Sequence, residues 1–295
     1  MEIVYHLGAH CTDEERLLRC LLKNRGALSA QGIVVPGPAR YRNLLRDTAI
    51  ALKGNPASRD TQALVLEQIM EEDIAKRLIL SWDSFLSYPM WSLKGRMYPT
   101  AAERVRAFSN IFPDIKAEFC IGVRNPATFL PGLFDKQLAD KSRAKSYADY
   151  FDGTDIFSLR WSDTLQSVLD ANPGAPLTVW SDEDTPLIWP EVLQAVAGHN
   201  EETKLEDTDD LLTSIMSTEG MTRLRAYLQS HPPANPALRR KVISAFLDKF
   251  ARPEKISQQV TLPGWTEELV ARLTETYERD VATIRTMPGI RFIAA

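Results

Sequence analysis

Short hydrophobic runs alternate with longer, more polar stretches over the first two thirds of the chain. The short runs are apolar at nearly every position, a pattern typical of strands that are covered on both faces in a parallel sheet. The longer stretches repeat hydrophobic residues at helical spacing. This alternation predicts a doubly wound α/β fold, with a mostly parallel sheet flanked by helices. The predicted strands are residues 3–7, 33–35, 77–81, 118–123 and 177–180, and the predicted helices are residues 12–29, 41–53, 60–75, 100–111, 127–140 and 156–169.

The pattern changes after Leu187, where helices follow one another with little strand between them. We expect one α/β domain over residues 1–295, of which about 200–295 form a helical cap. The acidic run at residues 201–210 is either a solvated loop or a site for a cation or a partner. The helices expected in this region are residues 190–197, 219–229, 236–250 and 266–286.

Charge and cysteine content narrow the classes of function. The chain holds 35 Lys and Arg against 39 Asp and Glu, a net charge of −4, so it has no basic excess with which to bind nucleic acid. The three cysteines, Cys11, Cys20 and Cys120, form no Cys-x-x-Cys pair, which favours a reducing compartment without disulfides. No stretch reaches the roughly 20 apolar residues that span a bilayer, and the chain opens without a signal-peptide pattern. We therefore expect a cytoplasmic protein with no membrane span.

Residues 2–18 read as a strand, a turn at Gly8 and the start of a helix. In such a unit the helix N-terminus carries unpaired N–H groups and a partial positive charge, which together bind anions. Here Thr12 and Glu15 have the Thr-x-x-Glu spacing of a capping box, with two more carboxylates between them. We therefore expect the helix to begin at Thr12 and to satisfy its N-terminus with its own side chains.

The same segment resembles a motif of the P-loop sulfotransferase family. In the bacterial branch of that family, the chain opens with a strand, the sequence His-x-Gly-x-His-Lys-Thr-Gly-Thr-Thr and a helix. The second motif of the family is a strand that ends in Arg and is followed by Asn-Pro or Asp-Pro, which residues 118–126 match with Arg124. The resemblance extends over about residues 2–200. The residues that match the first motif in register are His6, Gly8, His10 and Thr12.

The resemblance implies a sulfotransferase that uses 3′-phosphoadenosine 5′-phosphosulfate as its cofactor. Gly8 and Thr12 correspond to the loop that binds the phosphosulfate group, and Arg124 corresponds to the residue that holds the 3′-phosphate. The sulfuryl group would pass to a hydroxyl or amine of a small-molecule or carbohydrate acceptor. His10 or Asp83 would be the base that removes the acceptor proton. Asp83 could instead make a local turn hydrogen bond.

Several motif positions carry residues that the family does not have. The carboxylates among them repel a phosphosulfate group, and the loop lysine that would stabilise its charge is missing. The alternative function is therefore a non-catalytic binding module that keeps the sulfotransferase fold and has lost the donor site. The replacements are Cys11 for Lys, Asp13 for Gly, Glu14 and Glu15 for hydroxyl residues, and Gly132 for Ser.

Two side chains are open to two interpretations each. Arg124 either holds a ligand phosphate or pairs with Asp13 or Glu14. Cys11 is either a reactive thiol, with its pKa lowered by a helix N-terminus, or an inert thiol that the nearby acids keep protonated. The two histidines and the cysteine of the opening segment do not have the spacing of a recognised metal site, so we expect no bound metal.

Overall fold

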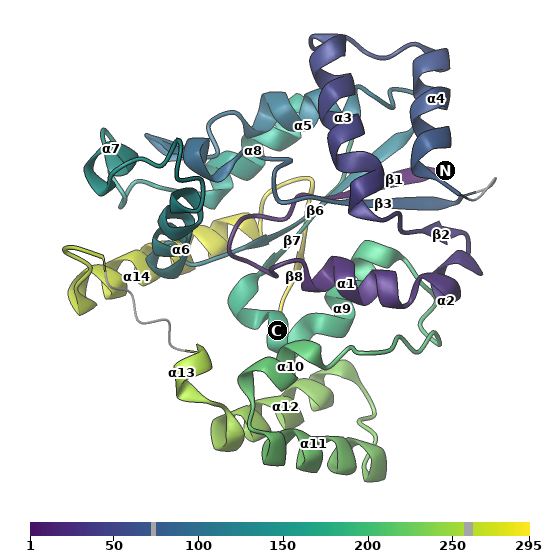
Figure 1. The fold of residues 1–295 in the computed structure, drawn as a ribbon. Coiled ribbons are helices and arrows are strands. Elements are labelled where there is room, and N and C mark those ends of the chain that lie inside the picture. The colour runs from purple at the N-terminus through teal and green to yellow at the C-terminus, as the bar shows by residue number, and fades with distance from the viewer. Residues whose placement is uncertain (72–74, 257–261) are drawn as a thin grey trace.

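A computed structural model of the chain describes residues 1–71, 75–256 and 262–295. It confirms an α/β fold in which six parallel strands form one sheet with helices on both faces (Figure 1). The strand order is β2-β3-β1-β6-β7-β8. The strands are β1 (Glu2–His6), β2 (Ile33–Val34), β3 (Arg77–Ser81), β6 (Lys116–Val123), β7 (Leu177–Ser181) and β8 (Ile290–Ile293), and five of them match the predicted strands to within two residues at each end.

Alternate residues of the strands face opposite layers of helices. In β1, Ile3 and Tyr5 belong to one hydrophobic cluster and Val4 belongs to the other. Because both faces of the sheet are buried, the strands are apolar at nearly every position. One layer contains α1 (Arg16–Lys23), α2 (Arg25–Ser29) and α9 (Thr185–Ala197), and the other contains α3 (Pro38–Leu52), α4 (Arg59–Ile69), α5 (Ala101–Ser109), α6 (Pro126–Leu138), α8 (Trp161–Ala171) and α14 (Glu267–Ile284).

The direction in which the chain crosses the sheet changes at β1. From β1 the chain first builds one side of the sheet, with β2 and β3, and later the other side, with β6, β7 and β8. In open α/β sheets, ligands bind at such a switch point, outside the carboxyl ends of the strands. His6, the last residue of β1, is in register with Ser81 of β3 and Cys120 of β6. The loops that follow these three strands therefore meet at one edge of the sheet.

The helix predicted from residue 12 begins later than expected and is interrupted. α1 begins at Arg16, and Asn24 separates it from α2. Glu15 has a left-handed φ of 62°, a conformation that a right-handed helix does not include. The prediction of one helix starting at Thr12 is therefore wrong, and the residues before Arg16 form a tight turn.

Most of the remaining helices begin and end within five residues of the predicted positions. The helix predicted at residues 60–75 ends as α4 at Ile69, and residues 72–74 lie outside the described ranges. Short elements between the long ones have no clear hydrophobic period, and the sequence does not reveal them. They are η1 (Pro89–Trp91), β4 (Leu93–Lys94), β5 (Arg96–Met97), α7 (Tyr147–Phe151) and η2 (Asp182–Asp184).

The C-terminal third is mostly helical, and α10 to α12 pack around a small hydrophobic cluster of their own beside α9. α14 instead lies on the main sheet, where Asp280 accepts hydrogen bonds from the backbone N–H groups of Trp161 and Ser162 at the start of α8. The last strand, β8, pairs with β7. The sequence gives little sign of β8, because only one of its four residues is buried. The other helices here are α10 (Asp210–Ile215), α11 (Thr218–Ser230), α12 (Pro236–Phe250) and α13 (Pro253–Ile256).

Candidate functional site

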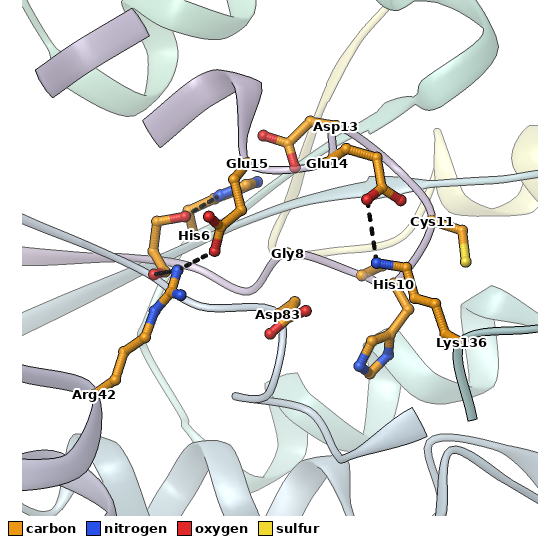
Figure 2. A pocket seen from close by; sticks show the side chains of 12 residues that line it. His6, Gly8, His10, Cys11, Asp13, Glu14, Glu15, Arg42, Asp83 and Lys136 are labelled. Carbon is orange, nitrogen blue, oxygen red and sulfur yellow. Dashed lines mark hydrogen bonds and ion pairs between the residues drawn. The ribbon is translucent and has the colours of Figure 1, made fainter. Parts of the chain in front are cut away.

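A small cavity lies at the carboxyl ends of β1 and β3, beside the loop that joins β1 to α1 (Figure 2). Its volume is about 30 Å³, which is room for about one water molecule. Gly8, His10 and Asp83 line the cavity, whereas Thr12 and Arg124 do not. The structure therefore brings the two predicted catalytic residues together and leaves two of the three predicted cofactor-binding residues outside the lining.

Gly8 occupies a position where the backbone of the loop passes close to the end of β3. Its φ is +53°, and a Cβ atom there would lie 3.2 Å from the backbone N and Cα of Asp83. A side chain at this position would therefore be both strained and crowded. The glycine fixes the loop against Asp83 and so determines the shape of the cavity.

The expected capping box at the start of α1 is wrong. Thr12 donates its hydroxyl to the carbonyl of Ala9 at 2.6 Å, and its side chain caps no helix N–H group. The carboxylate of Asp13 instead accepts the backbone N–H of Leu17 at 3.0 Å. The helix still satisfies part of its N-terminus with an acid of the loop, but Asp13 supplies that acid and Glu15 is free to bind elsewhere.

Two cations that the sequence analysis did not single out reach the cavity from helices on the far side of the loop. Arg42 of α3 forms an ion pair with Glu15 at 2.6 Å. Lys136 of α6 forms an ion pair with Glu14 at 3.2 Å. Figure 2 shows these two pairs on opposite sides of the cavity, with Asp83 between them. No local pattern marks either cation, because each acts through the packing of its helix beside the loop.

The groups that line the cavity leave it with an excess of negative charge. Two basic side chains oppose four carboxylates, which gives a net charge of −2 when the histidines are neutral. Three of these acids belong to the β1–α1 loop itself. The carboxylates are Asp13, Glu14, Glu15 and Asp83, and the basic side chains are Arg42 and Lys136.

Arg124 is bound within the protein, but not by the acids that the sequence suggested. One of its terminal nitrogens donates to the carbonyl of Cys11 and lies 3.7 Å from the carboxylate of Asp182, at the end of β7. Its Nε atom donates to Thr128 at 3.0 Å. The described ion pairs of Arg124 thus involve neither acid of the β1–α1 loop. Asp182, which follows a strand two positions away from β1 in the sheet, is its carboxylate partner.

Asp182 is an unusual acid because little of its surface meets water. Burial raises the pKa of Asp182 to about 7. Arg124 lowers that pKa, while the neighbouring carboxylates, Glu183 first among them, raise it. Near neutral pH this group is therefore only partly ionised, and it neutralises Arg124 only in part.

Cys11 and Gly132, which occupy two of the altered motif positions, contact each other. A Cβ atom on Gly132 would lie 3.0 Å from Sγ of Cys11, closer than an ordinary contact. The cysteine in the loop therefore requires a residue without a side chain on α6. Burial raises the pKa of the Cys11 thiol to about 12, which agrees with the inert interpretation and not with a reactive thiolate.

Tyr98 holds both the backbone and the ring of His10. The Tyr98 hydroxyl oxygen accepts the backbone N–H of His10 at 2.9 Å and lies 2.8 Å from Nδ1 of the same residue. The hydroxyl group can donate to Nδ1 or accept from it, according to the tautomer of the ring. Burial lowers the pKa of His10 to about 4, so the ring is neutral. Nε2 has no partner in the described part of the chain, and the role of His10 as a base stays a prediction.

His6 and Asp83 are held by local contacts. Nδ1 of His6 lies 2.9 Å from the hydroxyl of Ser81, and its ring stacks on Trp180. Asp83 accepts a hydrogen bond from the hydroxyl of Ser84 at 3.2 Å, which is the local turn interaction that the sequence suggested. Because its carboxyl group also lines the cavity, this bond does not remove Asp83 from the site.

Within residues 1–71, 75–256 and 262–295, no group of three or more His, Cys, Asp or Glu side chains has the geometry to hold a metal ion. No helix in the same ranges is both long enough and apolar enough to cross a bilayer. Comparisons of the chain with protein-family models, with curated proteins and with solved structures give no match.

Proposed function

We propose that the protein is a non-catalytic binding module with a sulfotransferase-like fold. In this module, carboxylates of the β1–α1 loop neutralise the cations that would otherwise bind the donor. One observation carries the proposal: both cations that line the cavity are paired with carboxylates of the loop. Arg42 pairs with Glu15, and Lys136 pairs with Glu14. Arg124, the third cation of the region, already has Asp182 and a loop carbonyl as partners.

The residues present fit the phosphosulfate group of the donor poorly. Two like charges 4 Å apart repel by about 4 kcal/mol at the effective dielectric of a protein surface. The cavity carries a net charge of −2, so a phosphosulfate there meets more repulsion than attraction. The volume of about 30 Å³ is also far below what a nucleotide occupies. A neutral or cationic ligand at the same edge of the sheet is compatible with this charge.

The test is a calorimetric titration with 3′-phosphoadenosine 5′-phosphate at low salt. We expect a dissociation constant above about 1 mM, which corresponds to roughly −4 kcal/mol. The double variant Glu14→Gln/Glu15→Gln removes the excess negative charge and should bind at least tenfold more tightly. Glu219→Gln, an exposed position on α11, serves as the control. A low micromolar constant for the unaltered protein would overturn the proposal.

A second candidate is sulfuryl transfer from 3′-phosphoadenosine 5′-phosphosulfate to a hydroxyl or amine of a small-molecule or carbohydrate acceptor. It is favoured by His10, whose Nε2 atom has no partner among the described residues and which lines the same cavity as Lys136. Lys136 would then supply the positive charge that the loop lacks, with Asp83 as the base. Release of 3′-phosphoadenosine 5′-phosphate in the presence of carbohydrate acceptors, abolished by Asp83→Asn, would support this candidate over the first.

A further inference from the structure

A second and larger pocket lies beside α1, and its lining shares no residue with that of the cavity. It is formed by α1, by α9 and by the segment that leads into α10, which lie next to one another in Figure 1. Its volume is about 200 Å³, enough for several non-hydrogen atoms and not only for water. The acidic run at residues 201–210 provides one wall.

The basic residues of this pocket lie on one face of α1. Arg16 pairs with Asp210 at 3.0 Å, and Lys23 pairs with Asp207. Arg19 lies between them, is exposed, and forms no hydrogen bond or ion pair through its side chain with any residue that the structure describes. Three cations therefore face two carboxylates, and the remaining charge of +1 belongs to a guanidinium group without a partner.

A second donor in the same pocket is also unused. The indole ring of Trp189 lines the pocket and is only 3 % exposed. Its Nε1–H finds no hydrogen-bond acceptor in the described ranges of the chain. Buried N–H groups of this kind are almost always paired, with protein, water or ligand. The indole nitrogen can only donate, as can the guanidinium group, so a common partner must be an acceptor.

We propose that this pocket binds a small oxyanion, a carboxylate or a phosphate group, between Arg19 and Trp189. The oxyanion accepts the indole N–H and neutralises the unpaired guanidinium group. Asp207 and Asp210 do not repel it strongly, because each already binds a cation of α1. In this arrangement the acidic run holds Arg16 and Lys23 in place and so leaves Arg19 as the group available to the ligand. The inference is independent of the function proposed for the cavity.

The experiment follows the indole N–H signals of ¹⁵N-labelled protein during titration with sodium phosphate and, separately, with sodium acetate. Sodium chloride at the same ionic strength is the reference. Trp189→Phe removes one indole signal and thereby assigns it, while an aromatic ring remains in the pocket. We expect the Trp189 signal to shift saturably with at least one of the two anions and the signals of the other tryptophans to stay in place. Saturation with phosphate alone identifies a phosphate ligand, and saturation with acetate identifies a carboxylate ligand.

Two further variants make the result decisive. Arg19→Gln should raise the dissociation constant at least fivefold, because it removes the charge that draws the anion. Arg223→Gln, on the exposed surface of α11, should leave the constant unchanged. Arg19 is exposed, so its replacement does not threaten folding. The proposal is overturned if neither anion moves the Trp189 signal beyond the sodium chloride reference, or if Arg19→Gln binds as tightly as the unaltered protein.

Discussion

The β1–α1 loop and the pocket between α1 and α9 border the same helix, yet they distribute charge in opposite ways. In the loop, both nearby cations are paired with acids and the cavity has a net charge of −2. In the pocket, two donors, Arg19 and the indole N–H of Trp189, have no partner, and the net charge is +1. The resemblance to sulfotransferases would place an anion in the first region. The net charge favours the second, whereas polar atoms without a partner among the described residues occur in both regions, Nε2 of His10 being one in the first.

The position of a site in the fold does not determine which ligand chemistry it accepts. The loop lies at a switch point of the sheet, where ligands bind in open α/β folds. That position does not make it an anion site, because what binds there depends on which donors are left unpaired. Glu14 and Glu15 occupy the donors that a ligand phosphate would otherwise use. The predictions below test whether this internal neutralisation is real, beginning with the largest expected effect.

The largest effect is a loss of stability between about pH 4 and pH 7 that depends on Asp182. Its pKa in the folded protein is about 7, against an ordinary value of 3.8. Because the folded-state pKa is raised, the stabilisation is fully present below about pH 4 and is lost as the pH rises through 7. A shift of about three units corresponds to at most roughly 4 kcal/mol. Urea denaturation between pH 5 and pH 8.5 should show this decline, and Asp182→Asn should flatten it. If the free energy of unfolding depends on pH in the same way for both proteins, the buried carboxyl group of Asp182 does not cause the decline.

The next effect concerns the contact between Cys11 and Gly132. Gly132→Ser introduces the residue that the sulfotransferase motif has at the corresponding position, but it places a Cβ atom 3.0 Å from Sγ of Cys11. We expect this crowding to lower the free energy of unfolding by about 2 kcal/mol. Cys11→Ala/Gly132→Ser should recover most of that loss, since the sulfur atom is gone. If the double variant is no more stable than Gly132→Ser alone, the two altered positions are not coupled through this contact.

The sequence predicts the sheet well because a strand buried on both faces leaves a clear hydrophobic run. It also places Arg124 correctly at the end of a strand. It does not reveal that Asp182 is the partner of Arg124, because the two residues are adjacent only after β6 and β7 pair. Lys136 and Arg42 enter the site in the same way, through the docking of α6 and α3 beside the loop.

The prediction for the start of α1 fails for a different reason. Thr12 and Glu15 have the spacing of a capping box, and local sequence favours that interaction. In the structure Glu15 has a left-handed backbone and pairs with Arg42, which lies on another helix. A contact between segments distant in the sequence therefore replaces the local cap. Motif spacing alone cannot anticipate such a replacement.

A smaller effect is expected for the ion pair between Arg124 and Asp182. In a double-mutant cycle with Arg124→Ala and Asp182→Ala, the interaction energy should be about 1 kcal/mol, and it should exceed about 0.5 kcal/mol. The matched cycle with Arg124→Ala and Asp13→Ala should be additive, because no ion pair joins those side chains among the described residues. Chemical denaturation of the six proteins involved provides the values. An interaction energy with Asp13 but none with Asp182 would mean that Arg124 pairs with an acid of the β1–α1 loop and not with Asp182.

The smallest effect tests the backbone of the loop at Glu15. Its φ of 62° costs a non-glycine residue about 1 kcal/mol, and its exposed ion pair with Arg42 contributes up to about 1 kcal/mol. Glu15→Gly loses the pair but relieves the backbone, so its free energy of unfolding should stay within about 0.5 kcal/mol of the unaltered protein. Glu15→Ala loses the pair without that relief and should be less stable by about 1 kcal/mol. Equal stabilities for the two variants would mean that the left-handed turn is unstrained. The loop would then adopt its conformation without the ion pair. The pairing of Glu15 with Arg42 would be a consequence of that conformation and not its cause.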